Sequence, residues 1–77
     1  PATDIVNYEF YVPVKGKVLI ELFDYSGAKV KVLVDEELDA GFYKKTIPVS
    51  NLNSGIYSVK SLYNGKIQFS RFVKFVK

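Results

Sequence analysis

The stretch Asn51-Leu52-Asn53-Ser54-Gly55-Ile56-Tyr57 is the part of the chain that best predicts its fold, because it joins a polar turn to the start of a strand. Asn, Ser and Gly favour turns, and glycine tolerates a positive φ that residues with a Cβ resist. We therefore expect a positive φ at Gly55. Leu52 is predicted to insert into the core from the loop, and Tyr57 to return to the core in the strand. These three residues are thus interpreted as a structural motif.

The rest of the chain alternates apolar and polar residues with a period of two, the pattern of half-buried strands. It predicts strands over residues 6–12, 18–22, 30–32, 43–49 and 57–63, and a last strand from residue 67 onward. In that last strand the phase changes near Ser70 and Arg71, which indicates a bulge or apolar residues on both faces. No segment has a helical period of useful length. We therefore predict an all-β fold, a small antiparallel immunoglobulin-like β-sandwich of six to seven strands.

Turn residues separate these strands. Asp24-Tyr25-Ser26-Gly27 has Asp first and Gly fourth, as a type I turn prefers. Asn64 and Gly65 indicate a type I′ hairpin turn, because both central residues of that turn need positive φ. Residues 35–41 are expected to be the longest polar connection. Pro48 suggests an edge position or a kink near the end of its strand.

Composition limits the classes of function. The 77 residues are predicted to form one domain, 1–77, and twelve aromatic residues are enough to build a core. Cysteine and histidine are absent, which excludes a disulfide framework and removes the usual general base and the commonest metal ligand. We therefore expect no enzyme, no cofactor and no metal. No apolar run approaches the roughly 20 residues that cross a bilayer, so a membrane span is not expected. The start at Pro1 has no leader pattern and no initiator Met, and we interpret the chain as the C-terminal module of a larger secreted protein.

The net charge of +3 is divided unevenly. Residues 1–39 hold all eight acids and four lysines, a charge of −4, whereas residues 40–77 hold seven basic residues and no acid, a charge of +7. This split predicts either an anionic partner for the second half or neighbouring strands that neutralise each other. A nucleic acid is not expected, because most aromatic residues occupy alternating core positions rather than a stacking surface.

The acids near the middle of the chain could offer oxygen ligands to calcium. They lack the Asp-x-Asp-x-Asp-Gly arrangement of a calcium loop. A solvated polar loop is therefore the expected state of Asp35, Glu36, Glu37 and Asp39.

Short motifs in a constant order extend over nearly all of the chain. They are Pro1-Ala2-Thr3-Asp4-Ile5, Gly16-Lys17-Val18-Leu19-Ile20-Glu21-Leu22-Phe23-Asp24, Ser26-Gly27-Ala28-Lys29-Val30, Leu33-Val34-Asp35, Ala40-Gly41-Phe42-Tyr43, and Leu52-Asn53-Ser54-Gly55-Ile56-Tyr57 before a lysine-rich last strand. In order and spacing they resemble the immunoglobulin-like C-terminal sorting domain of the type IX secretion system. The similar immunoglobulin-like domain of the flagellar hook-capping protein shares this pattern. The family's Asn-Pro lead-in is missing from this chain.

The resemblance implies a function. Such domains carry a larger protein through the periplasm and across the outer membrane to the cell surface or the medium, and they are often removed afterwards. It implies two partners, the outer-membrane secretion machinery and the upstream domain of the parent protein. It also makes the basic residues of the last strand candidates for recognition: Lys66, Arg71, Lys74 and Lys77.

In the sorting interpretation the basic residues present positive charge to a secretion component, while Ile67, Phe69, Val73 and Phe75 hold the last strand in the sheet. Two other interpretations stay open. The lysines could instead simply protect an edge strand from aggregation. Alternatively, the domain could be a non-catalytic accessory module of a secreted enzyme, either a spacer or a carbohydrate-binding module. Sugar stacking would use exposed aromatic rings, and the candidates are Tyr11, Tyr25, Phe42 and Tyr63.

Overall fold

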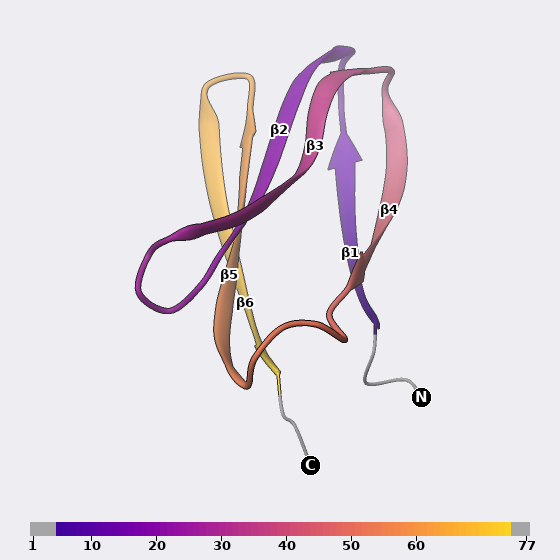
Figure 1. Cartoon of the computed structure of the whole chain (residues 1–77). Coiled ribbons are helices and arrows are strands. Elements are labelled where there is room, and N and C mark those ends of the chain that lie inside the picture. Colours follow the sequence, from indigo (N-terminus) through magenta and orange to yellow (C-terminus); the bar gives the residue numbers. More distant parts are fainter. Residues whose placement is uncertain (1–4, 75–77) are drawn as a thin grey trace.

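The computed structural model describes residues 5–74, which form six antiparallel strands in two sheets (Figure 1). The strands are β1 (Ile5–Val12), β2 (Gly16–Phe23), β3 (Lys29–Leu38), β4 (Gly41–Pro48), β5 (Gly55–Tyr63) and β6 (Lys66–Lys74). A two-stranded sheet has the order β1-β4, and a four-stranded sheet has the order β3-β2-β5-β6. The predicted all-β sandwich of six to seven strands is confirmed. Within residues 5–74, no helix is long and apolar enough to cross a membrane.

The core lies between the two sheets and follows the predicted alternation. In β1, inward positions are buried or half-buried while Ile5, Asn7, Glu9 and Tyr11 are exposed. The buried apolar set comes from both sheets and from the residue that follows β4: Val12, Val18, Ile20, Leu22, Leu33, Val34, Ile47, Val49, Tyr57 and Val59. Leu52 packs against this core from the loop between β4 and β5, as predicted.

The turns between β2 and β3 and between β5 and β6 occur where the sequence predicts them. Gly27 donates its N–H to the carbonyl of Asp24 at 3.0 Å and closes the β2–β3 turn. Asn64 and Gly65 have φ values of 52° and 76°, so both central residues of the β5–β6 turn are left-handed, as a type I′ turn requires. Gly55 has φ 159°, which is positive as expected but close to fully extended. The strong conformational demand therefore falls on Gly65 rather than on Gly55.

The stretch 35–41 corrects the sequence prediction. It is not a polar loop: β3 continues through Leu38, and only Asp39 and Ala40 connect it to β4. The register against β2 shifts twice, between Ile20 and Glu21 and between Leu22 and Phe23. These irregularities bury consecutive residues, Leu33 and Val34, and leave Val30 and Val32 exposed. The simple alternation that marks a strand is therefore lost in the sequence of β3.

The two sheets are unequal, and this decides where the molecule is open. The short connections 13–15 and 39–40 tie the two-stranded sheet to β2 and β3 of the four-stranded sheet. At the far edge, β6 has no strand opposite it in the described residues. Its inward residues Lys66, Gln68 and Ser70 are exposed as a result.

Candidate recognition surface

Lys74, at the end of β6, is buried rather than presented to a partner. Its side chain points inward, its exposed fraction is 8%, and its ammonium group donates hydrogen bonds to the carbonyl oxygens of Val49 and Leu52. The second of these distances is 3.4 Å. The expectation that Lys74 shows its charge at the surface is therefore wrong. A buried ammonium needs partners, and here it holds the β4–β5 loop against the last strand.

Tyr57 anchors the other end of that loop. Its ring is 7% exposed and stacks on Phe72 of β6, with the ring centroids 5.5 Å apart. Its hydroxyl donates to the carbonyl oxygen of Asn53 at 2.7 Å, which pins the turn just before Gly55. Tyr57 therefore contacts both the β4–β5 loop and β6.

The same arrangement occurs a second time, a repeat that the sequence reading missed. Asp39-Ala40-Gly41-Phe42-Tyr43 matches Asn53-Ser54-Gly55-Ile56-Tyr57 in residue character. The Tyr43 hydroxyl donates to the Asp39 carbonyl at 2.6 Å, four residues back, as Tyr57 does to Asn53. In both places a Cβ on the glycine would lie 3.9 Å from the tyrosine ring. The starts of β4 and β5 are therefore built in the same way, by a tyrosine hydroxyl that binds the carbonyl four residues earlier. The shared Gly-x-Tyr spacing is the feature of the sequence that could have predicted this repeat.

The outward face of β6 is apolar, which corrects a second expectation. Ile67, Phe69 and Val73 are 54%, 66% and 53% exposed, so they do not hold the strand in the sheet. That task falls to Phe72 on the inner face. The register against β5 is continuous from Tyr63 to Gly55, without the bulge considered in the sequence, and apolar residues occupy both faces. Phe75 and Lys77 lie outside the described residues.

Arg71 lies within this apolar face. It is exposed, it lies between Phe69 and Val73 on the outward side of β6, and no ion pair within residues 5–74 involves it. Together with Lys60 of β5 it borders a shallow depression of about 470 Å³. The other lining residues are Phe23, Asp24, Tyr25, Gly27, Ile56, Ser58 and Phe69. An exposed apolar face with a cation at its centre is the chemistry of a docking surface.

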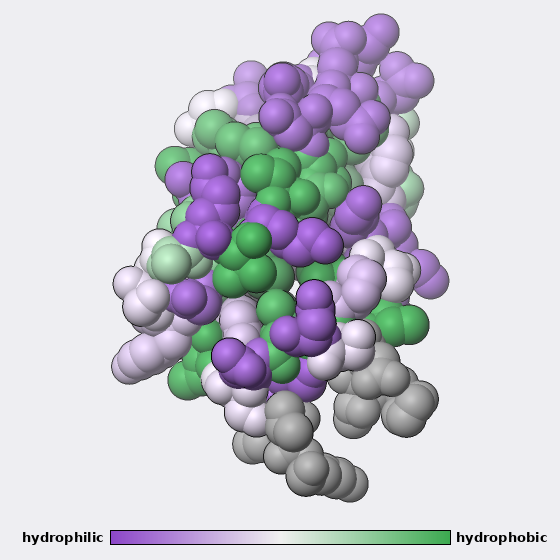
Figure 2. Space-filling model, viewed as in Figure 1, coloured by the Kyte–Doolittle hydropathy of each residue, from purple (hydrophilic) through white to green (hydrophobic). Residues whose placement is uncertain are grey.

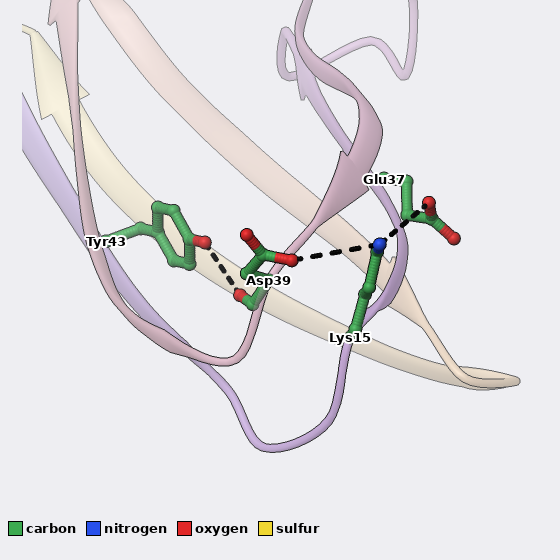
Figure 3. Close-up of polar contacts among 4 residues, drawn as sticks. All are labelled: Lys15, Glu37, Asp39 and Tyr43. Carbon is green, nitrogen blue, oxygen red and sulfur yellow. Dashed lines mark hydrogen bonds and ion pairs between the residues drawn. The ribbon is translucent and has the colours of Figure 1, made fainter.

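In the described residues, acidic residues of the first half of the chain (residues 1–39) form ion pairs with lysines of the same half, not with basic residues of the second half. The four ion pairs of the described part all join residues of the first half: Lys15 to Glu37 and to Asp39, Lys17 to Asp35, and Lys29 to Glu21. Figure 3 shows Lys15 reaching both carboxylates, with the Tyr43 hydroxyl directed at Asp39. Cross-strand neighbours such as Glu9 and Lys44 do reduce the imbalance. Within residues 5–74, Lys60, Lys66 and Arg71 of the β5–β6 hairpin take part in no ion pair.

Hydrophilic and hydrophobic residues separate on the surface. Figure 2 shows hydrophilic residues gathered over the upper end, where the β1–β2 and β3–β4 connections lie, with hydrophobic residues exposed below them. Among the described residues, no group of three or more acidic residues could hold a metal ion. Hydrogen bonds from the Ser26 side chain and the Ala28 backbone lower the pKa of Asp24.

The aromatic residues considered for sugar binding lie in different places. Tyr11 and Phe42 are neighbours on the outer face of the two-stranded sheet, 55% and 83% exposed, with ring centroids 4.6 Å apart. Tyr25 is 80% exposed on the β2–β3 turn, beside the depression at Arg71. Tyr63 is half-buried and bonds through its hydroxyl to the backbone of Val14, so it is structural.

A family comparison fits this architecture. The family model described as "Secretion system C-terminal sorting domain" matches residues 1–75, nearly the whole chain. The chain therefore belongs to the family of secretion system C-terminal sorting domains. Comparison with curated proteins and with solved structures gave no match.

Membership in this family carries the function. The chain is a type IX sorting module, a secretion signal that directs an exported protein across the outer membrane to the cell surface or the medium. A secretion signal of this kind is not a catalytic family. Its function implies contact with the secretion machinery.

Proposed function

We propose that the outer-membrane secretion machinery recognises this module through the outward face of the β5–β6 hairpin, with Arg71 as the central charged contact. The observation that carries the proposal is an exposed Arg71, without an ion pair to any residue of the range 5–74, among the exposed side chains of Phe69 and Val73. An apolar surface supplies binding energy when it leaves water, and a guanidinium adds orientation through its fixed donors. The surface is presented as a whole only when β6 is paired with β5.

The basic candidates then have different roles. Arg71 acts in recognition, and Lys60 adds a second positive charge across the strand pair, directly opposite Phe69. Lys74 acts through the fold, because its ammonium is committed to two loop carbonyls. Lys66 is exposed beside the hairpin turn and points to the inner side of β6, where it also discourages edge-to-edge aggregation. Lys77 stays a candidate on the resemblance alone.

An export assay tests this proposal. Residues 1–77 are fused behind a reporter with a periplasmic signal, in a bacterium with a type IX system. Arg71→Glu is compared with Lys44→Glu, because each lowers the net charge by the same amount and Lys44 lies on the other sheet. We expect Arg71→Glu to reduce reporter in the medium and on the surface by about tenfold, the effect of losing one charged contact. Equal export by the two folded variants would contradict the proposal.

The same proposal includes the position of this domain, which we place at the C-terminus of a larger protein. A protein that uses it would carry its activity in an upstream domain, and the module would add none. Export of an unrelated reporter by residues 1–77 alone would support this division. Periplasmic retention of that fusion, with the module folded, would contradict it.

A second candidate function, carbohydrate binding, is favoured by the exposed Tyr11–Phe42 pair. The two rings lie beside polar Glu9 and Lys44, and an aromatic face with neighbouring polar groups suits the apolar face of a sugar. Titration of residues 1–77 with soluble polysaccharides, compared with the Tyr11→Ala and Phe42→Ala variants, tests it. Absence of binding, or equal binding by the variants, would remove this candidate.

A further inference from the structure

An open groove runs between the two sheets along β1. It has a volume of about 570 Å³, and it is bordered on one side by residues 8–14 and on the other by the inner side of the β5–β6 hairpin. The hairpin contributes Ser61, Tyr63, Lys66, Gln68 and Ser70 to the lining. This groove is separate from the outward face on which the proposed export contact lies.

The wall of the groove formed by β1 is a free strand edge. Within residues 5–74, β1 pairs with β4 alone, over all eight of its residues. The other edge of β1 therefore directs every second pair of backbone N–H and C=O groups toward the groove. Such unpaired groups are a template for another extended chain, because backbone hydrogen bonds to a strand edge need no particular side chain.

The floor of the groove shows that it has room for a strand. The four-stranded sheet continues past β1 to β6, whose inward residues Gln68 and Ser70 are exposed although they face the sandwich interior. A strand added next to β1 would lie about 4.8 Å from it and would cover this floor. The two-stranded sheet would then have three strands, and β6 would gain a layer opposite it.

Because β6 extends beyond the edge of the two-stranded sheet, it forms an overhang that decides which kind of partner fits. Pairing with β1 of a second copy would bring that copy's own β6 to the same side of the joined sheet. The two overhanging β6 strands would then compete for the space of one strand. A single extended segment has no such overhang and fits the groove.

The side chains that line the groove define the chemistry of that segment. Its inward residues would meet hydroxyl and amide groups of Ser70, Gln68 and Ser61, so polar residues that hydrogen-bond suit these positions. Lys66 is exposed there and takes part in no ion pair of the described residues, so an acidic residue suits the position nearest the hairpin turn. The half-buried rings of Tyr8 and Phe10 add an apolar wall.

We infer that the free edge of β1 accepts an extended acidic segment of a partner polypeptide, which adds to the two-stranded sheet as a third strand over the inner side of β6. The site does not depend on Arg71 or on the outward face of the hairpin. It gives the module a second contact, so that it can bind one protein through the β1 groove while the β5–β6 face remains exposed.

The test uses residues 1–77 and a synthetic probe, the capped peptide Thr-Val-Glu-Val-Thr-Val-Glu-Val, which has polar and acidic residues on one face. Binding is followed by NMR chemical shifts and amide exchange. We expect shifts and slowed exchange in β1 together with shifts in residues 66–70. The same peptide with alternate amides N-methylated cannot complete the strand pairing, and we expect its affinity to fall by more than about tenfold.

Two matched variants locate the peptide. Ser70→Trp fills the groove from the floor, and Ser58→Trp places the same ring on the outward face of the hairpin, where Ser58 lies opposite Arg71. We expect Ser70→Trp to weaken binding by about tenfold or more and Ser58→Trp to leave it unchanged, with both variants folded by circular dichroism. Loss of binding in Ser58→Trp alone, shifts confined to the free edge of β6, or a peptide-free dimer with protected β1 amides would each overturn the inference.

Discussion

Replacing Lys74 with methionine separates a structural role from a recognition role. The substitution keeps the length and packing of the stem but removes the ammonium that binds the carbonyl oxygens of Val49 and Leu52. A hydrogen bond from a charged donor contributes about 1.5–3 kcal/mol, and the carbonyls left behind can be partly hydrated as the loop relaxes. We therefore expect a loss of about 2–3 kcal/mol in the free energy of unfolding.

This loss would be a large share of the stability of so small a domain. At about 0.05–0.15 kcal/mol per residue, a chain of 77 residues has about 4–12 kcal/mol in total. The expected loss corresponds to a fall in Tm of about 8–24 °C for a domain of this size. Urea unfolding followed by circular dichroism measures the free energy directly, and a thermal melt measures the shift.

The control is Lys31→Met, since Lys31 is exposed on β3 and forms no ion pair in the described residues. Its effect should stay within about 0.5 kcal/mol. If Lys74→Met were as stable as Lys31→Met, the structural role derived from burial would be refuted. If export were lost at unchanged stability, Lys74 would be a recognition residue after all.

Two further predictions concern Tyr57 and Asp24. Tyr57→Ala should lower the free energy of unfolding by about 3–5 kcal/mol, because it leaves a cavity beside Phe72. Tyr57→Phe should lower it by about 1 kcal/mol, because the hydrogen bond to the Asn53 carbonyl is lost. If urea unfolding showed a loss near zero for Tyr57→Ala, the ring would not be in the core. Hydrogen bonds hold the pKa of Asp24 below its ordinary value of 3.8, so its carboxylate contributes stability that is present above that value and is lost as the pH falls through the lower, folded-state pKa. Asp24→Asn should therefore flatten the fall of Tm as the pH drops below about 4, and an unchanged dependence of Tm on acid pH would contradict this origin.

Much of the fold could be predicted because its signals are local. Alternation in β1 and the type I′ signal of Asn64 and Gly65 depend on neighbours in sequence, and both are confirmed. The Leu52-to-Tyr57 step placed its core residues for the same reason. The order of motifs along the chain carried the family, and with it the export function, without any view of the strands in space.

The predictions that proved wrong concern features that depend on contacts between segments distant in the sequence. Alternation in β3 is hidden by two register shifts against β2, so its acidic end was taken for a loop. In β6 both faces carry apolar residues, and the sequence offered no means to choose which face points inward. The choice buries Phe72 against Tyr57 and turns Phe69 to solvent.

The sequence by itself determined the all-β class, the β2–β3 and β5–β6 turns and the membership in a sorting-domain family, because these follow from period, turn chemistry and the order of motifs. Only the tertiary structure decided that Lys74 is buried and binds the β4–β5 loop, and that Arg71 is exposed within an apolar face. It also decided that a groove opens along β1. The physical reason is the unequal size of the two sheets: two strands cannot cover four, so one edge of the larger sheet stays open.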